Sequence, residues 1–334
     1  MSKVDKEYHN LLEKILQEGY TYEDPNRKGV NRIEIPSYTF RHEFKDGFPA
    51  ITTKKLHYKN VATELIWFLR GDTNIKYLVD NGCNIWNKDA LNFHKKKYPA
   101  DISLPTNEFI EQVKEGVSGD LGKVYGHYWR DYDGFDQIQD IIDKMINTPM
   151  SSEIIVTARN PNDKDNQALP CCHYGFQIVM RPLNKIKCEC SESQAIYCGS
   201  KCQKTQYGFE LHWQQRSVDT FLGLPFNIAS YATLALILEK ITGHKALGIQ
   251  GDLKKVHLYD NSLDAVKEQL SRDVDKYNDV DLLFKDEFHY ITDKELVGNV
   301  SLNKIISEMK PDWFALENYE SYPGIKVEML ERDE

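Results

Sequence analysis

The sequence predicts a mixed α/β (α+β) fold, and three observations support this prediction. Runs rich in apolar, β-branched or aromatic residues, typical of buried strands, occur at residues 154–156, 176–180 and 209–213. Apolar residues at helical spacing mark residues 5–19 and 229–242. No repeat or low-complexity linker divides the 334 residues, so we expect one catalytic domain, residues 1–334, with surface insertions.

The first half of the chain has four recognisable segments and one insertion. Residues 5–19 favour a helix, and the Asp-Pro-Asn-Arg-Lys-Gly segment at 24–29 favours a loop. Residues 32–43 alternate apolar and polar side chains, as a half-buried strand does. Residues 61–69 read as an apolar helix whose one carboxylate is Glu64. Residues 92–118 are polar, Lys-rich at their start, and predict a peripheral insertion.

The rest of the chain contains the three predicted strands, a second insertion and a long helix. The insertion, at about residues 181–208, separates the second and third of these strands and is rich in cysteine. The helix at 229–242 should end near Gly243, because helices commonly end at glycine.

Composition excludes several classes of function. The formal net charge of −9 argues against broad nucleic-acid binding, which needs a basic face, although one local phosphate site is compatible with it. No apolar run approaches the roughly 20 residues of a membrane span, and the N-terminus lacks an apolar signal core. We therefore expect a cytoplasmic protein, in the host cytoplasm if viral, whose 7 cysteines are thiols or ligands rather than disulfides.

Cys172 is the predicted nucleophile. A lone cysteine is more often a small buried apolar residue, but His173 follows directly and Arg216 lies on a later strand. A nearby cation increases the thiolate fraction of a cysteine. Cys171 is adjacent, but side chains alternate along a strand, so only one of the two thiols should face the pocket.

Three further side chains suit a pyrimidine nucleotide. Arg216, which alone could be a surface charge, becomes a bidentate phosphate ligand beside Ser217 and Asp219. Asn227 offers a donor and an acceptor, which match the N3–H and O4 of a uracil edge. Glu64 is either a helix carboxylate satisfied by backbone or a proton-transferring acid with a raised pKa.

With these residues in view, the chain resembles the thymidylate synthase family over most of its length. The resemblance rests on many ordered motifs. They are Asn26-Arg27 with Gly29, Asp46 to Pro49 with Thr52-Thr53-Lys54, Glu64 to Gly71, Ile85-Trp86, Asp120 to Arg130, Cys172-His173, Gln215 to Asp219, Leu222 to Tyr231, His257 to Tyr259 and Tyr322 to Lys326.

The resemblance implies a homodimer that uses dUMP and 5,10-methylenetetrahydrofolate, with a twisted mixed sheet at the subunit interface. Cys172 would attack C6 of the base, and C5 would then capture the methylene carbon of the folate. The implied roles of the other residues group by function: catalysis by Glu64, Tyr125, His173 and Asp219; phosphate binding by Arg27, Arg216 and Ser217; base binding by Asn227; ribose binding by His257 and Tyr259; folate binding by Trp86, Asp219 and Lys54. Gln215 is a further substrate-binding residue.

The chain departs from the family at several positions. An arginine pair that reaches the partner's phosphate falls at Ser152 and Glu153, Arg159 replaces a tryptophan, and Lys255 replaces an aspartate. The C-terminal tail is longer and charged. Arg159 and Lys255 resemble phage deoxycytidylate hydroxymethylases, whereas Asn227 keeps a uracil preference. This combination favours a phage-type dUMP hydroxymethylase making 5-hydroxymethyl-dUMP; the alternative is a thymidylate synthase that makes dTMP and dihydrofolate.

Two other hypotheses concern the cysteines and the class of protein. Four closely spaced cysteines in the second insertion suit a structural zinc ion, the alternative being four free thiols: Cys188, Cys190, Cys198 and Cys202. A non-catalytic nucleotide- or RNA-binding relative could also keep the fold, but the intact Cys172, Glu64, Tyr125 and Asn227 argue against it.

Overall fold

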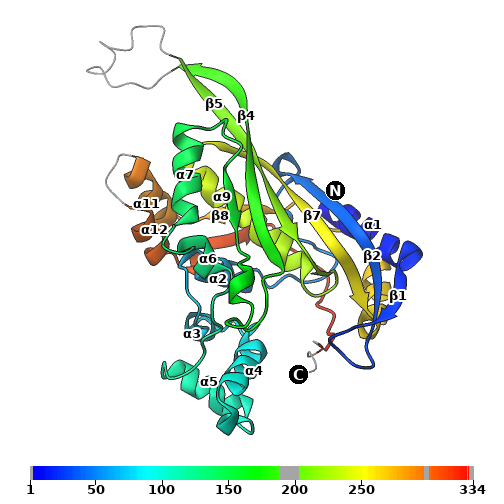
Figure 1. Ribbon diagram of the computed structural model, residues 1–334. Helices are drawn as coiled ribbons and strands as arrows, with labels where there is room; N and C mark the ends of the chain where they lie inside the picture. The colour runs from blue at the N-terminus through cyan, green and yellow to red at the C-terminus, as the bar shows by residue number, and fades with distance from the viewer. Residues whose placement is uncertain (1–2, 188–202, 297–300, 329, 331–334) are drawn as a thin grey trace.

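A seven-stranded mixed sheet forms the centre of the molecule in the computed structural model, which describes residues 3–187, 203–296, 301–328 and 330 (Figure 1). The strand order is β1-β2-β7-β5-β4-β3, and β6 also pairs with β7. β7 runs parallel to β5 and β6, whereas the other pairs are antiparallel. The strands are β1 (Tyr20–Glu23), β2 (Asn31–Glu43), β3 (Ile155–Thr157), β4 (His173–Lys187), β5 (Gln203–Gln215), β6 (Val218–Asp219) and β7 (Lys245–Tyr259).

Helices pack on this sheet. A second, two-stranded sheet is formed by β8 (Asp281–Phe284) and β9 (Phe314–Glu317), and β9 contacts α2. α9 contacts β5 and β7, α2 packs on α9, and α1 contacts β2. The helices are α1 (Lys3–Glu18), α2 (Tyr58–Leu69), α3 (Lys76–Asp80), α4 (Asn87–Lys97), α5 (Thr106–Lys114), α6 (Gly126–Arg130), α7 (Gln137–Asn147), α9 (Leu224–Thr242), α10 (Leu263–Leu270), α11 (Asp286–Leu296) and α12 (Leu302–Glu308).

α9 is the central helix of the core. In the part of the chain that the structure describes, it is the one helix long and apolar enough to cross a membrane, but 72% of it is buried inside the protein. Burial on all sides explains its nearly continuous apolar sequence. It begins five residues before the predicted start, because Pro225 is tolerated in the first turn of a helix. It ends as predicted at Gly243, whose φ of 70° is left-handed.

The mixed fold and its predicted elements are confirmed, but several elements are longer than predicted. α2 begins at Tyr58 rather than at residue 61, and β4 and β5 extend well beyond the apolar runs that revealed them. Part of the second insertion therefore continues the sheet as an antiparallel ribbon, in which Lys187 pairs with Gln203. This ribbon projects from one end of the molecule (Figure 1).

Residues 92–118, the predicted first insertion, form a small helical region at the edge of the molecule (Figure 1). It contains the end of α4 and all of α5, which contact each other and lie at the end of the molecule opposite the ribbon (Figure 1). Phe109 and Val113 of α5 are fully buried, so the insertion has its own apolar contacts and is not a polar loop throughout.

Candidate active site

Two adjacent cysteines precede β4, and the structure separates them by environment. Cys171 is 1% exposed, and burial raises the pKa of its thiol to about 12. Its sulfur accepts the backbone N–H of Tyr125 at 3.3 Å. Cys172 is partly exposed. Cys171 is therefore held as a neutral, buried thiol, and Cys172 is the cysteine that a ligand can reach.

Tyr125, at the start of α6, lies directly against Cys172. Its hydroxyl accepts the backbone N–H of Cys172 at 2.8 Å. Burial, followed by the charges of the two neighbouring thiols, raises the pKa of Tyr125 well above its usual value, so the phenol keeps its proton. A protonated phenol beside the sulfur can donate one further hydrogen bond to a ligand.

Arg216 follows β5 and fixes the cysteine loop. Its guanidinium donates to the carbonyls of Pro170 at 2.7 Å and Cys171 at 3.0 Å, and its Nη2 lies 3.7 Å from Cys172 Sγ. Its backbone N–H donates to the Cys172 carbonyl at 2.9 Å. The sequence predicted that Arg216 binds a phosphate. The structure adds a contact between its guanidinium and the sulfur of Cys172.

Glu64 is presented by α2 toward the same region. Its Oε1 accepts the indole N–H of Trp86 at 2.7 Å, and the Trp86 ring lies 6.0 Å from the Tyr125 ring. Burial raises the pKa of Glu64 to about 7, although the Trp86 hydrogen bond opposes this shift. A carboxyl group with a pKa near 7 can both give and take a proton under neutral conditions.

His173, the first residue of β4, is enclosed by aromatic rings. Its ring centroid lies 5.1 Å from that of Tyr125 and 5.6 Å from that of Tyr231. Burial lowers its pKa to about 4, so the imidazole is neutral near pH 7. A neutral imidazole does not supply a cation to Cys172.

Asn227 on α9 is oriented by a chain of buried polar contacts. The Gln215 side chain donates to Asn227 Oδ1 at 3.2 Å, and Gln215 Oε1 accepts the indole N–H of Trp213 at 3.3 Å. Trp213 packs directly over Gly251 of β7, where an added Cβ would lie 2.4 Å from the indole. Gly251 thus permits the close packing that positions Trp213, Gln215 and Asn227.

Asp219 and Ser217 lie in β6 and directly before it, and Lys54 is close enough to Asp219 for the two charges to interact. Asp219 Oδ1 accepts two backbone N–H groups, at 3.1 and 3.0 Å, and the Ser217 carbonyl accepts from Gln215 at 3.1 Å. The Lys54 ammonium donates to the Phe221 carbonyl and lies 3.6 Å from the Phe221 ring centroid. Burial lowers the pKa of Lys54 to about 7, although the Asp219 charge opposes this effect.

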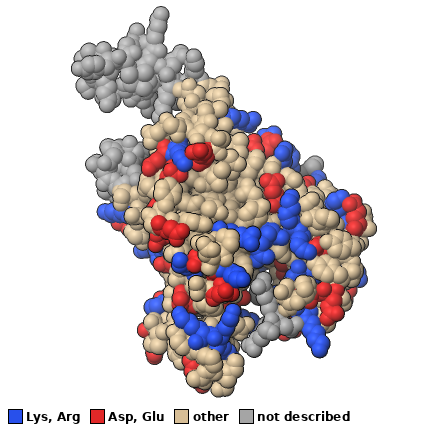
Figure 2. All heavy atoms as spheres, viewed as in Figure 1, with Lys and Arg blue, Asp and Glu red and all other residues tan. Residues whose placement is uncertain are grey.

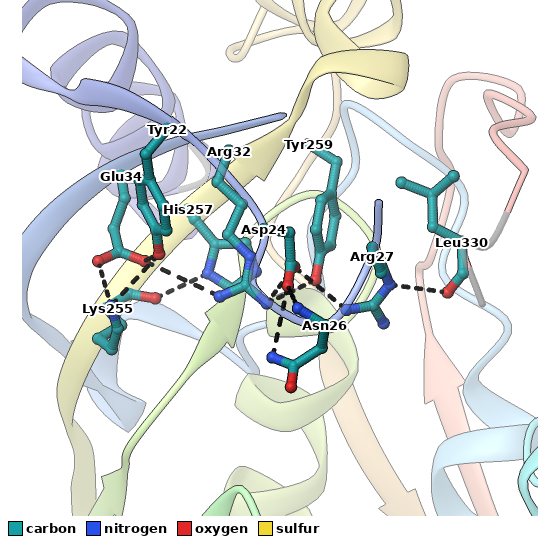
Figure 3. Close-up of polar contacts among 10 residues, drawn as sticks. All are labelled: Tyr22, Asp24, Asn26, Arg27, Arg32, Glu34, Lys255, His257, Tyr259 and Leu330. Atoms are coloured by element: carbon teal, nitrogen blue, oxygen red, sulfur yellow. Dashed lines mark hydrogen bonds and ion pairs between the residues drawn. The ribbon is translucent and has the colours of Figure 1, made fainter. Parts of the chain in front are cut away.

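His257 and Tyr259, at the end of β7, form a second group with the loop that carries Arg27 (Figure 3). Their ring centroids are 5.0 Å apart. The Arg27 guanidinium lies 5.0 Å from the Tyr259 ring centroid, and its Nε donates to the Leu330 carbonyl at 3.2 Å. The C-terminal segment therefore reaches the predicted phosphate loop.

Sequence reasoning missed Arg32 and Asp24 in this group. Arg32 is 7% exposed and donates to the Tyr259 hydroxyl at 3.1 Å. It also lies 2.5 Å from the carboxylate of Asp24, which is 2% exposed. The alternation of residues 32–43 predicted the strand correctly, but it gave no sign that its inward face begins with charged residues.

The departures from the family pattern occupy different environments. Ser152, Glu153 and Arg159 are exposed. The Lys255 ammonium pairs with Glu34 at 2.9 Å, while its carbonyl lies 2.8 Å from His257 Nδ1. The backbone of Lys255 therefore orients His257, and its charged side chain is directed to Glu34 and Tyr22 (Figure 3).

The proposed zinc ligands lie outside the described residues, and this part of the hypothesis stays a prediction: Cys188, Cys190, Cys198 and Cys202. Across residues 3–187, 203–296, 301–328 and 330, no group of three or more His, Cys, Asp or Glu side chains is arranged to hold a metal ion.

Comparison with known proteins decides the family. A family model described as thymidylate synthase matches residues 6–331. The chain belongs to the thymidylate synthase family. It is 35% identical to the thymidylate synthase of Malacoplasma penetrans over 327 residues, which cover 96% of this chain and 98% of that protein. It is 36% identical to the Mycoplasma mobile thymidylate synthase over 330 residues, with 97% and 99% coverage. It is also 36% identical to the Mycoplasma pneumoniae thymidylate synthase over 272 residues, with 80% and 85% coverage.

Membership in the family establishes the class of activity. The protein is an enzyme, a one-carbon transferase that acts on dUMP, and its family uses methylenetetrahydrofolate as co-substrate. The relatives share the name thymidylate synthase, so they favour that activity over the hydroxymethylase that the changes at Arg159 and Lys255 suggested.

Proposed function

We propose that the protein converts dUMP and 5,10-methylenetetrahydrofolate to dTMP and dihydrofolate through a covalent adduct between Cys172 and C6 of the base. The observation that carries this proposal is the environment of Cys172: a reachable thiol beside the Arg216 guanidinium and a protonated Tyr125. A cation 3.7 Å from the sulfur stabilises negative charge there, and the thiolate is the nucleophilic form of cysteine.

The reaction proceeds by addition to the pyrimidine and later elimination. The Cys172 thiolate forms a bond to C6, and the electron pair of the C5–C6 double bond makes C5 nucleophilic. C5 bonds to the methylene carbon of the folate and then loses its proton. The folate nitrogen leaves, which produces an exocyclic methylene group. A hydride from tetrahydrofolate reduces this group to methyl, and Cys172 departs.

Glu64, Tyr125 and His173 serve the proton transfers and the hydrogen bonds around the base. The pKa of about 7 for Glu64 suits a group that protonates a departing nitrogen in one step and accepts a proton in another. The phenol of Tyr125, which contacts the backbone of Cys172, takes part in removal of the C5 proton. The neutral imidazole of His173 is assigned a supporting role beside Tyr125, whose ring it contacts.

Asn227 recognises uracil. Its Oδ1 already accepts a hydrogen bond from Gln215, which fixes the amide so that its oxygen faces the N3–H and its nitrogen faces O4. Cytosine presents the opposite pattern at the exocyclic position, because its amino group donates. The amide of Asn227 therefore selects dUMP over dCMP.

The remaining predicted residues bind phosphate, sugar and folate. Arg27, Arg216 and Ser217 hold the phosphate, and His257 and Tyr259 hold the sugar hydroxyl. Trp86, Asp219 and Lys54 contact the folate. On the acidic chain, Lys and Arg side chains gather in a band across the middle of the face in Figure 2, which fits attraction of two anionic substrates.

A thymidylate synthase rather than a hydroxymethylase is supported by the environment of Lys255 as well as by the relatives. Its side chain is paired with Glu34 and Tyr22, and its backbone still orients His257. The change from aspartate therefore leaves His257 held, so Lys255 gives no reason to expect water at the methylene group. Hydride transfer from tetrahydrofolate is the step that this proposal assigns to that group.

We also infer a homodimer of one-domain subunits that pairs through the sheet. Ile155 of β3 and Val179 of β4 are 48% and 43% exposed on neighbouring strands, although they are large and apolar. Such exposure on a sheet is typical of a surface that another copy covers. The cytoplasmic location and the phage source stay predictions.

Trapping with 5-fluoro-dUMP tests the covalent mechanism. Fluorine at C5 cannot leave as a proton does, so an active enzyme should form a covalent complex with this nucleotide and methylenetetrahydrofolate. We expect a mass increase equal to both ligands in the wild type and in Cys171→Ser, and none in Cys172→Ser. A wild-type protein that forms no adduct would overturn the proposal.

A further inference from the structure

The imidazole of His257 has a defined hydrogen-bond polarity. Its Nδ1 lies 2.8 Å from the Lys255 carbonyl, which can only accept, so Nδ1 carries a proton. Burial, the largest effect, lowers the pKa of His257 overall, so the ring is neutral and Nε2 is an acceptor. Nε2 is buried and has no hydrogen-bond partner among the described residues. A ligand that donates a hydrogen bond to it would satisfy this atom.

The neighbouring phenol has the opposite polarity. The Tyr259 hydroxyl oxygen accepts a hydrogen bond from Arg32 Nη2 at 3.1 Å. A guanidinium has no acceptor, so the proton of Tyr259 must point elsewhere. Burial raises the pKa of Tyr259 even though two arginines oppose the shift, and the phenol keeps its proton. Tyr259 is therefore left as a donor toward a ligand.

Arg32 is held in this orientation by a buried carboxylate. Asp24 Oδ2 lies 2.5 Å from Arg32 Nη2 and also accepts from Arg27 at 3.3 Å. The Asp24 side chain is fully buried, and its Oδ1 accepts the backbone N–H of Asn26 at 2.8 Å. A charge-assisted pair between two buried groups restricts the guanidinium to one position. Figure 3 shows the contacts of Arg32 with both Asp24 and Tyr259.

The carbonyl that orients His257 is also fixed. Lys255 has a φ of 47°, which is uncommon for a residue with a side chain. Its ammonium pairs at 2.9 Å with Glu34, whose side chain is fully buried and also accepts from the hydroxyls of Tyr20 and Tyr22, each at 2.7 Å. This ion pair holds the unusual backbone turn, and with it the Lys255 carbonyl.

We propose that Arg32 is a positioning residue that fixes Tyr259 as a donor opposite His257 as an acceptor, so that the two side chains together recognise one sugar hydroxyl. A hydroxyl group both donates and accepts, and it satisfies both side chains. A hydrogen atom in place of this hydroxyl would satisfy neither side chain. A fluorine atom there would accept from Tyr259 but could not donate to His257. The assignment of the ligand as the sugar of dUMP rests on the proposed function; the polarity of the pair rests on the contacts of Arg32 and Lys255.

The test compares dUMP with 2′,3′-dideoxyuridine monophosphate, which lacks the hydroxyl. The quantity measured is the ratio of kcat/KM for dUMP to that for the dideoxy nucleotide. In Arg32→Met we expect this ratio to fall about tenfold, mainly through a higher KM for dUMP, with the dideoxy value unchanged. Tyr259→Phe should lower the ratio by a similar factor, and the double variant should add no further fall.

Two results would overturn the proposal. One is an equal loss with both nucleotides in Arg32→Met, which would mean a general structural role. The other is an additive loss in the double variant, which would mean that Arg32 acts independently of Tyr259. If Arg32→Met does not fold, Arg32→Lys keeps a cation beside Asp24 but not the planar fork; an unchanged ratio in that variant would equally contradict the proposal.

Failure of the proposed function is distinguishable from failure of this inference. If the wild type binds dUMP but does not turn it over, calorimetric dissociation constants for the two nucleotides replace kcat/KM. The same loss of discrimination, about tenfold, is then expected in Arg32→Met, and its absence would contradict the assigned role of Arg32.

Discussion

Replacing Glu64 by glutamine should abolish turnover and, at the same time, stabilise the folded protein above neutral pH. Burial raises the pKa of Glu64 to about 7 in the folded state, against 4.5 for the ordinary group. A carboxylate that is harder to ionise in the folded state destabilises that state wherever the unfolded chain has already lost the proton. The glutamine side chain is nearly the same size as that of glutamate and cannot ionise, so the variant lacks this cost.

The pH dependence of the gain follows from the direction of the shift. Below pH 4.5 the carboxyl is protonated in both states, and the variant gains nothing. Between pH 4.5 and about 7 the unfolded chain ionises first, and the wild type progressively loses stability. Above pH 7 the cost is constant at about 3.4 kcal/mol, because the two pKa values differ by about 2.5 and each pKa unit corresponds to about 1.36 kcal/mol. The measured gain at pH 8 should be smaller, about 2 kcal/mol, because Glu64 is not fully buried.

Urea denaturation, followed by tryptophan fluorescence, gives the free energy of unfolding of the wild type and the variant at pH 4 and at pH 8. Glu13→Gln, at an exposed position on α1, is the matched control and should show no pH-dependent gain. An equal effect of Glu64→Gln at pH 4 and pH 8, or a loss at pH 8, would refute the reasoning about burial of this carboxyl.

Four further predictions test other parts of the site. Cys172→Ser should lower kcat by about 10³-fold or more while Cys171→Ser stays active; activity in Cys172→Ser would remove the covalent mechanism. Asn227→Asp should shift the ratio of kcat/KM toward dCMP by about 100-fold, because a second carboxylate oxygen accepts the cytosine amino group; an unchanged ratio would mean that another residue reads the base. Trp86→Phe should raise the apparent pKa of Glu64 in the pH profile of kcat, because it removes a hydrogen bond that favours the ionised form; a lower value would contradict this. The protein should contain about one zinc per subunit by elemental analysis, and metal-free protein prepared without chelator would oppose the Cys188–Cys202 hypothesis.

The elements that were predictable from sequence are those whose residues show a clear pattern. Apolar and polar residues alternate at 32–43, and this located β2 to within one residue, although the buried face changes where Glu34 and Ile35 are both buried. The start of α9 was missed because its first turn contains a proline and mixes buried with partly exposed residues, so no helical stripe marks it. The extension of β4 and β5 as a ribbon was missed because its residues are polar, and backbone pairing leaves little trace in such a sequence.

The candidate site shows the same limit. Motifs identified Cys172, Arg216 and Asn227 as candidates, because each of these residues lies in a short sequence motif. They could not reveal Asp24 and Arg32, because a buried ion pair between a loop and a strand depends on tertiary placement. They also made Lys255, in place of an aspartate, one of the two signs of a hydroxymethylase. The structure shows that its carbonyl, which any residue supplies, makes the contact to His257.

The most direct test of the central claim is the identity of the product made from dUMP and methylenetetrahydrofolate. Mass analysis of the nucleotide, together with the near-ultraviolet absorbance of the folate, separates the two outcomes. The account predicts dTMP as the sole nucleotide product, with a stoichiometric absorbance rise as tetrahydrofolate is oxidised to dihydrofolate. 5-Hydroxymethyl-dUMP with no absorbance rise would contradict it and would show that water, not hydride, reaches the methylene group of the Cys172 adduct.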